Sequence, residues 1–125
     1  MLLVCAATLQ LGCERHRLDT QVETDLGLTF TAVPDLLYSE TYGSAEEGGD
    51  RALLRIEGED CVKVGALLDA ARPSDPRSHY YRMFKAEGLD PPSVQTKYMN
   101  DPGGDWKLYA LDNASCVLFR QAHFE

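Results

Sequence analysis

The residues that could carry acid–base or metal chemistry in this chain include three histidines, His16, His79 and His123. They lie far apart in the sequence, and none stands at the spacing of a known metal-binding motif. Asp75 precedes His79 by four positions, so on a helix its carboxylate could orient the imidazole or raise its pKa. Because no activated nucleophile accompanies this pair, we interpret it as a surface pair and predict no catalytic residue, metal site or cofactor.

The four cysteines are the second source of chemistry, and their meaning depends on the start of the chain. Neither Cys5 with Cys13 nor Cys61 with Cys116 has the short paired spacing of a zinc or redox site. The run from Leu2 to Leu11 is mostly apolar, too short for a helix that spans a bilayer, which needs roughly 20 apolar residues. It has the length of the apolar part of a signal peptide, about 7 to 15 residues.

The end of this run, Leu9-Gln10-Leu11-Gly12-Cys13, resembles the signal of bacterial lipoproteins. Gly12 and Cys13 match that class, whereas Gln10 and Leu11 depart from it, and no Lys or Arg precedes the run. The resemblance implies that residues 1–12 form a signal-like segment, that Cys13 receives lipid, and that the protein is anchored to a membrane in the bacterial periplasm. The alternative is that residues 2–11 form a buried first element of a cytoplasmic domain.

The export hypothesis determines how many cysteines are left to form a disulfide. If Cys5 leaves with the signal and Cys13 carries lipid, Cys61 and Cys116 remain as a single pair. An even remainder suits a disulfide formed in an oxidising compartment. In the cytoplasmic alternative the same two thiols would be small buried apolar groups.

Acidic residues dominate the charge. The chain has 20 Asp and Glu against 12 Lys and Arg, a net charge of -8, which disfavours binding to nucleic acid and to anionic lipid headgroups. Most of the excess lies between positions 13 and 50, which either form a solvated acidic stretch or face a basic protein partner. For the second alternative we predict a docking surface in the segment from Glu40 to Asp60, with the partner-binding residues Glu40, Glu46, Glu47 and Asp50.

The first half of the chain alternates between charged and apolar segments. Residues 13–25 lack a sustained apolar period and are predicted to form a tether. Residues 26–33 alternate apolar and polar side chains, which is typical of a half-buried strand, and residues 36–50 are predicted to be irregular. Residues 51–57 form the next predicted strand.

The second half predicts two helices and a hairpin. A helix is expected from Glu59 or Asp60 to Ala71, and another from Pro76, capped by Asp75, to Glu87. Residues 93–99 fit a strand or a short helix. Residues 106–112 and 116–124 predict a C-terminal β-hairpin. We therefore expect residues 26–125 to form a single α+β domain, an antiparallel sheet with about two helices on one face.

These patterns favour a non-enzymatic, envelope-anchored module that binds another protein. An immunity or inhibitor protein against a cationic toxin or cell-wall hydrolase is one form of this hypothesis, and an accessory subunit of a secretion or envelope assembly is another. A small enzyme near Asp75 and His79 is the third class, and a cytoplasmic domain the fourth. Aromatic residues could supply the contact area of a binding patch, because they lose little entropy on binding: Tyr38, Tyr42, Tyr80, Tyr81, Tyr98 and Trp106.

Overall fold

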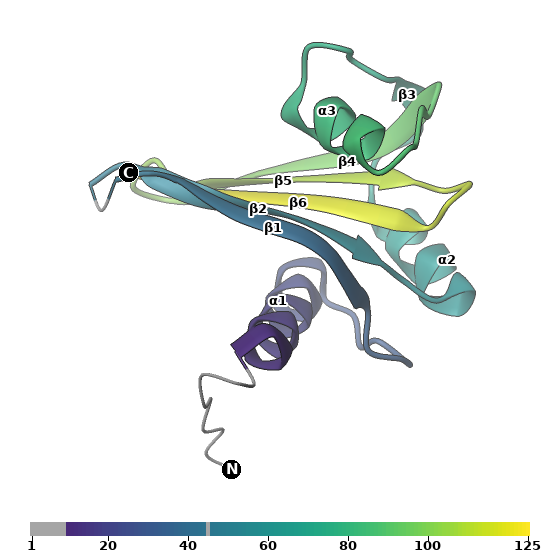
Figure 1. Ribbon diagram of the computed structural model, residues 1–125, viewed down its shortest axis with the longest axis horizontal. Helices are drawn as coiled ribbons and strands as arrows, with labels where there is room; N and C mark the ends of the chain where they lie inside the picture. Colours follow the sequence, from purple (N-terminus) through teal and green to yellow (C-terminus); the bar gives the residue numbers. More distant parts are fainter. Residues whose placement is uncertain (1–9, 45) are drawn as a thin grey trace.

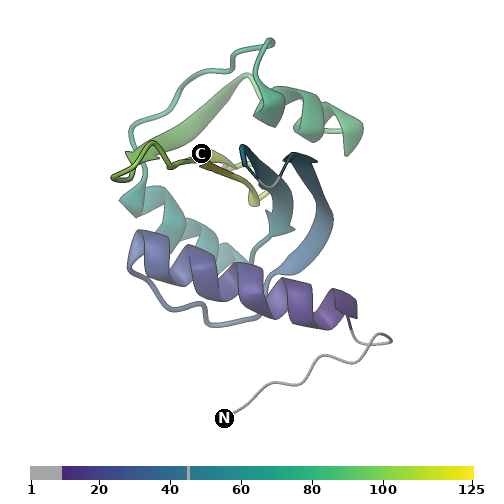
Figure 2. The same cartoon turned by 90° about the vertical axis from the view of Figure 1, so that its left-hand side faces the viewer.

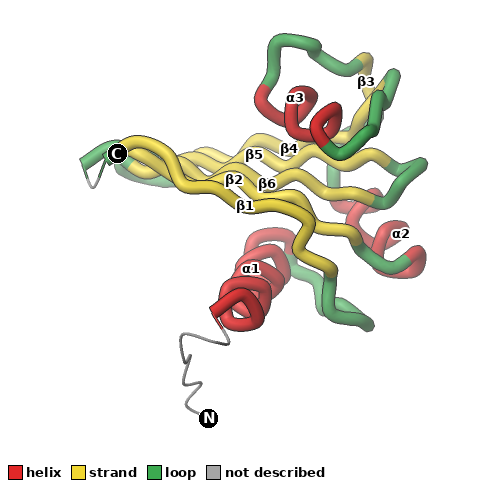
Figure 3. The backbone as a smooth tube through the Cα atoms, viewed as in Figure 1, coloured by secondary structure: helices red, strands yellow, loops and turns green. Residues whose placement is uncertain are grey.

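The computed structural model describes residues 10–44 and 46–125, with side chains described from Leu18 onward (Figures 1 and 3). Of the predicted signal-like segment 1–12, residues 1–9 lie outside the described residues, and the side chain of Cys13 is also outside them. The elements, in chain order, are α1 (Gln10–Leu26), β1 (Asp35–Gly43), β2 (Gly48–Arg55), α2 (Gly58–Leu67), β3 (Arg72–Pro73), α3 (His79–Ala86), β4 (Ser93–Asn100), β5 (Trp106–Asp112) and β6 (Val117–Phe124).

The described strands form one six-stranded sheet in the order β1-β2-β6-β5-β4-β3. Every neighbouring pair is antiparallel. The predicted α+β class and the antiparallel sheet are therefore confirmed, as is the hairpin of β5 and β6, in which Asp112 pairs with Val117.

The two faces of the sheet are covered differently. Helices α1 and α2 lie on one side, which we call the closed face, and α3 lies on the other (Figure 2). Helix α3 packs against Leu53, Ala110 and Phe119 near one end of the strands, and the strands continue past it (Figure 1). We call this second side the open face. The prediction of helices on one face alone was wrong, because successive strand residues such as Leu53 and Leu54 are both buried and both faces need a cover.

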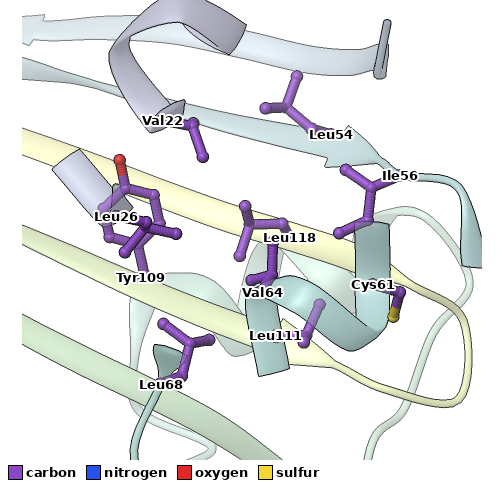
Figure 4. Packing of buried hydrophobic residues seen from close by; sticks show 10 residues of the cluster. All are labelled: Val22, Leu26, Leu54, Ile56, Cys61, Val64, Leu68, Tyr109, Leu111 and Leu118. Carbon is purple, nitrogen blue, oxygen red and sulfur yellow. The ribbon is translucent and has the colours of Figure 1, made fainter. Parts of the chain in front are cut away.

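The closed face contains the larger core, shown in Figure 4. Val22 from α1 and Val64 from α2 are fully buried against Leu118 of the central strand β6. Burial of one such side chain contributes about 1.5–3 kcal/mol. The whole cluster consists of Val22, Leu26, Leu54, Ile56, Cys61, Val64, Leu68, Tyr109, Leu111 and Leu118.

A disulfide joins Cys61 in α2 to Cys116, immediately before β6. The two Cα atoms are 5.6 Å apart, and the bridge closes a loop of 55 residues. The predicted disulfide pair is present, and it indicates folding in an oxidising compartment.

The segment 13–25 was predicted to be a tether, and this was wrong for the residues whose side chains are described. It belongs to α1, where Leu18, Val22 and Leu26 stand at helical spacing and are buried. The stripe is only one residue wide per turn, so the charged residues between its members hide it in the sequence.

A buried polar network fixes α1 to the sheet. Asp25 accepts hydrogen bonds from the Tyr109 hydroxyl at 2.5 Å and from Lys107 Nζ at 2.9 Å, and its Oδ2 lies 3.3 Å from Arg120 Nη2. Burial alone would raise the pKa of Asp25. The hydrogen bonds from Tyr109 and Lys107 and the charge of Arg120 outweigh burial and hold that pKa below its usual value. The anchored helix therefore depends on an ionised Asp25.

The segment 26–33 was predicted to be a strand, but Leu26 ends α1 and residues 27–33 form a turn followed by irregular chain. Its backbone donors are satisfied by carboxylates rather than by a neighbouring strand. Asp60 accepts hydrogen bonds from the backbone N–H groups of Thr31 and Ala32, at 3.0 and 3.2 Å, and Glu23 accepts from Phe30 N–H at 2.8 Å. Glu23 lies on α1 just before the segment and Asp60 lies 29 positions after Thr31, so the strand-like alternation within the segment could not reveal these partners.

The segment 36–50, predicted to be irregular, contains β1 and the start of β2. β1 is an edge strand, and its acidic and hydroxyl side chains suit an edge in contact with water. The second predicted helix is shorter than expected: Ser78, not Asp75, caps it, and the Ser78 hydroxyl accepts a hydrogen bond from Tyr81 N–H at 3.2 Å.

Candidate functional site

The open face presents its side chains in successive levels across the strands. In the level under α3, Leu53 pairs with Phe119 and Phe119 with Ala110. In the next level Arg51 stands between Glu40 and Gln121. The outermost level, past α3, lies at the end of the strands near the C-terminus, at the left of Figure 1. It contains the side chains that the helix does not cover.

Aromatic rings cross these outer levels from one side of the sheet to the other. Trp106 of β5 stacks on His123 of β6 with ring centres 5.0 Å apart, and on Tyr98 of β4 at 5.9 Å. His123 also stacks on Tyr42 of β1 at 5.8 Å. We call Tyr42, His123, Trp106 and Tyr98 the aromatic row. Tyr98 is 59% exposed, so the row offers contact area to another molecule.

Gly49 of β2 makes the row possible. It pairs with both Tyr42 and His123, so it lies between the two rings. A Cβ at this position would lie 2.1 Å from the Ala122 carbonyl oxygen and 2.7 Å from the Tyr42 hydroxyl. The absent side chain therefore lets Tyr42 lie across β2 and hydrogen-bond to His123 Nδ1 at 2.9 Å.

Arg51 connects the aromatic row with the region under α3. Its guanidinium carbon lies 4.0 Å from the centre of the Tyr42 ring, which is cation–π geometry. Its Nη1 also pairs with Glu40 at 3.2 Å. Because Gln121 Nε2 donates to the Tyr42 hydroxyl at 2.8 Å, the row is held by hydrogen bonds as well as by stacking.

Acidic side chains lie beside the aromatic row. Glu47 and Glu125 approach His123 Nε2 at 3.6 and 3.8 Å. Asp105 accepts a hydrogen bond from the backbone N–H of Glu125 at 3.0 Å. We call Glu46, Glu47, Asp105 and Glu125 the acidic rim. Glu47, His123 and Glu125 bring possible ligand atoms within 4.8 Å of one another, but exposed acids gather in this way without an ion, and we assign no metal to them.

The predicted partner-binding acids do not form one surface. Glu46 and Glu47 are exposed in the turn between β1 and β2, and Glu40 lies on the open face beside Arg51. Asp50 points to the closed face, where its Oδ1 lies 3.4 Å from Nη1 of the buried Arg120. Asp50 therefore contributes to the network around α1 and lies away from the other three acids.

The predicted Asp75 and His79 pair does not form. Helix α3 begins at His79, so Asp75 precedes the helix, and its carboxylate lies 3.6 Å from Arg77 Nε. His79 contacts Arg51 and Arg82 instead. His79 borders a cavity between α3 and strands β1 and β2, and none of the described residues that line this cavity is a serine, threonine or cysteine.

The structure brings together part of the predicted aromatic patch. Tyr42, Tyr98 and Trp106 belong to the aromatic row, whereas Tyr80 is on the buried side of α3 and the Tyr81 hydroxyl bonds to Asp90. Sequence reasoning missed His123. The alternation that places Phe119 on the open face also places His123 there, so the signal was present in β6.

Comparison with protein-family models, with curated proteins and with solved structures finds no match for this chain. Among the described residues, no helix combines the length and apolar character needed to cross a membrane.

Proposed function

We propose that this chain is an exported, envelope-anchored module that binds another protein through the outer part of its open face. The aromatic row is the observation that carries this proposal. Tyr, Trp and Arg are the residues that most often dominate binding energy at protein interfaces, since they bring large area at low entropy cost. On the open face past α3, Tyr98 is exposed, Tyr42 and Trp106 are half-buried beside it, and Arg51 lies against the Tyr42 ring with a largely buried side chain.

The charge around the row favours a basic partner. Glu46, Glu47 and Glu125 are exposed beside the rings, and the chain as a whole carries a net charge of -8. A Lys or Arg of the partner can stack on an aromatic ring while a neighbouring carboxylate pairs with its charge. An immunity or inhibitor protein against a cationic toxin or cell-wall hydrolase is the form of partner-binding that fits this surface.

The export part of the proposal is supported by two independent features. One is the lipoprotein-like sequence that ends at Cys13. The other is the disulfide between Cys61 and Cys116, which reducing cytosol would not maintain. We propose lipid attachment at Cys13 and a periplasmic location on these grounds.

Site-specific photo-crosslinking in the native cell tests the binding surface. A photoreactive phenylalanine derivative at position 98 samples the open face, and the same group at position 62 samples α2, where Val62 is 74% exposed. We expect an adduct with one basic protein from position 98 and not from position 62. Equal adducts from both positions, or none from position 98, would contradict the proposal.

Charge reversal in the acidic rim is the matched test with the purified partner. Glu46→Lys with Glu47→Lys should weaken binding and reduce its dependence on salt. Glu57→Lys with Asp69→Lys makes the same charge change at exposed positions beside α2 and should leave binding close to wild type. Asp50 is left intact, because a lysine there would face the buried Arg120.

Intact-mass measurement of the protein made in a bacterial host tests the anchor. We expect a chain cleaved before Cys13 and carrying lipid, and the Cys13→Ala variant should lack the lipid. An unprocessed wild-type chain would reject the anchor and leave the binding surface to be judged by crosslinking.

A further inference from the structure

A cavity of about 500 Å³ lies on the open face between α3 and strands β1 and β2. Leu53, Met83 and Ala86 form the apolar part of the cavity, and Tyr38 also lines the cavity. Its polar part contains Arg51, His79 and Arg82, together with the carboxylates of Glu40 and Glu87. Pockets that bind small organic molecules have this size and this mixture of apolar wall and few polar groups.

Around the His79 imidazole, hydrogen-bond donors outnumber acceptors. Arg82 Nη2 lies 2.5 Å from His79 Nδ1, and Arg51 Nη2 lies 3.3 Å from His79 Nε2. A guanidinium only donates, and a neutral imidazole has one accepting nitrogen. At least one of the two contacts therefore brings donor against donor.

Neither arginine is fully satisfied by the protein. Arg51 pairs with Glu40, but its Nε is buried and has no hydrogen-bond partner among the described residues. Arg82 has no carboxylate partner in the described part of the chain. Burial, followed by the charges of Arg51 and Arg82, lowers the pKa of His79, and the more weakly acting Glu40 opposes this. An acceptor group in the cavity would remove the conflict.

We propose that this cavity binds an organic carboxylate with a short apolar body. The carboxylate oxygens accept hydrogen bonds from Arg82 and His79, and the apolar body packs on Leu53, Met83 and Ala86. Glu40 and Glu87 also border the cavity, so a singly charged carboxylate fits better than a doubly charged phosphate. A free organic acid and the carboxyl terminus of a peptide share this chemistry. This cavity is a different site from the partner surface proposed above, and Arg51 borders both of them.

Calorimetric titration with two matched pairs of probes tests the proposal. The first pair is 4-phenylbutyrate and its uncharged amide, and the second is an acetylated Ala-Ala-Leu peptide with a free or an amidated carboxyl terminus. We expect at least one acid to bind with a Kd of about 1 mM or tighter, and its amide about tenfold more weakly. Binding by the first acid indicates a free organic acid, and preference for the second indicates a peptide terminus.

Two variants and two controls locate the binding. Arg82→Gln should weaken the acid about tenfold, and Ala86→Trp should abolish binding by filling the cavity. Arg77→Gln removes another exposed arginine, and Ala66→Trp enlarges an exposed alanine on α2; both should bind like wild type. Thermal unfolding verifies that all four variants fold.

The His79 imidazole provides an independent spectroscopic signal. A bound carboxylate should raise its pKa against the opposing charges of Arg51 and Arg82, which NMR titration of the ring protons measures. Acid and amide of equal affinity, no binding by either acid at about 10 mM, or undiminished binding by Ala86→Trp would each overturn the proposal.

Discussion

The closed and open faces of the sheet differ in how completely their side chains are used by the fold. On the closed face, α1 and α2 cover the strands, a disulfide joins α2 to the sheet, and Asp25, Tyr109 and Arg120 satisfy one another. On the open face, α3 covers one end, and the aromatic row lies past it.

If the proposed function holds, the closed face serves stability and the open face serves recognition. Arg120 has a 4% exposed side chain and is neutralised by Asp25 and Asp50, as buried charges in a stable core must be. On the other face Tyr98 and Tyr38 remain 59% and 46% exposed. A fold gains little from such rings, and the proposed function assigns them to contact with another molecule. Changes on the closed face should therefore unfold the protein, and changes on the open face should mainly alter binding.

The largest effect is expected from loss of the disulfide. The double variant Cys61→Ser, Cys116→Ser frees a loop of 55 residues in the unfolded chain and should lower the free energy of unfolding by about 4 kcal/mol. Urea unfolding measures this change. Wild-type protein under reducing conditions should match the variant, and a loss of less than about 1 kcal/mol would show that the bridge contributes little.

Loss of Asp25 should have the next largest effect. Asp25→Ala leaves Arg120 buried with Asp50 as its remaining carboxylate, and we expect a loss of about 3 kcal/mol. The control is Asp75→Ala, which removes the exposed pair with Arg77 and should hardly change the unfolding curve. Similar effects of the two variants would mean that the buried network does not hold α1.

The same carboxylate predicts a pH dependence. The pKa of Asp25 is lowered in the folded protein, so its contribution is complete above the unfolded pKa of about 3.9 and is lost as pH falls through the lower folded pKa. The unfolding free energy of wild type should therefore decline in acid more steeply than that of Asp25→Asn. Parallel curves would contradict this assignment.

Local sequence patterns predict the elements whose apolar residues suffice to define them. The hairpin of β5 and β6 was found in this way, and so were Cys61, Val64 and Leu68 of the predicted helical stripe, whereas its other two predicted members, Leu67 and Ala71, are exposed. Helix α1 was missed because its buried side includes Asp25, whose partners Tyr109 and Arg120 lie more than 80 positions away along the chain. Its polar residues suggested solvent exposure until those partners were known.

The candidate site was predicted only in part for a similar reason. Aromatic residues could be counted, but which of them meet depends on the register between strands from opposite ends of the chain. Tyr42 reaches His123 across Gly49, and the pairing of β2 with β6 is what places these three together. No local pattern around Gly49 distinguishes it from a turn glycine.

Gly49 lies in the sheet between Tyr42 and His123 of the aromatic row, and its substitution should have an intermediate effect on stability. Gly49→Ala places a Cβ against the Ala122 carbonyl and the Tyr42 ring, which should cost about 2 kcal/mol and displace Tyr42 from His123. Gly58→Ala is the matched control, because it begins α2 in open space and should stabilise slightly. If Gly49→Ala left both the unfolding free energy and the His123 ring signals unchanged, the position of the Tyr42 ring would not depend on a glycine at position 49.

The smallest effect on stability is expected from Tyr98→Ala in the aromatic row. Because the side chain is 59% exposed, the unfolding free energy should change by no more than about 0.5 kcal/mol. By contrast, Tyr80→Ala on the buried side of α3 should lower the free energy of unfolding by about 3 kcal/mol. Trp106 is the one tryptophan of the chain and stacks on Tyr98, so its emission should shift to longer wavelength in Tyr98→Ala while the fold persists. A large loss of stability in Tyr98→Ala would instead assign the aromatic row to the hydrophobic core. The open and closed faces would then differ only in the helices that cover them.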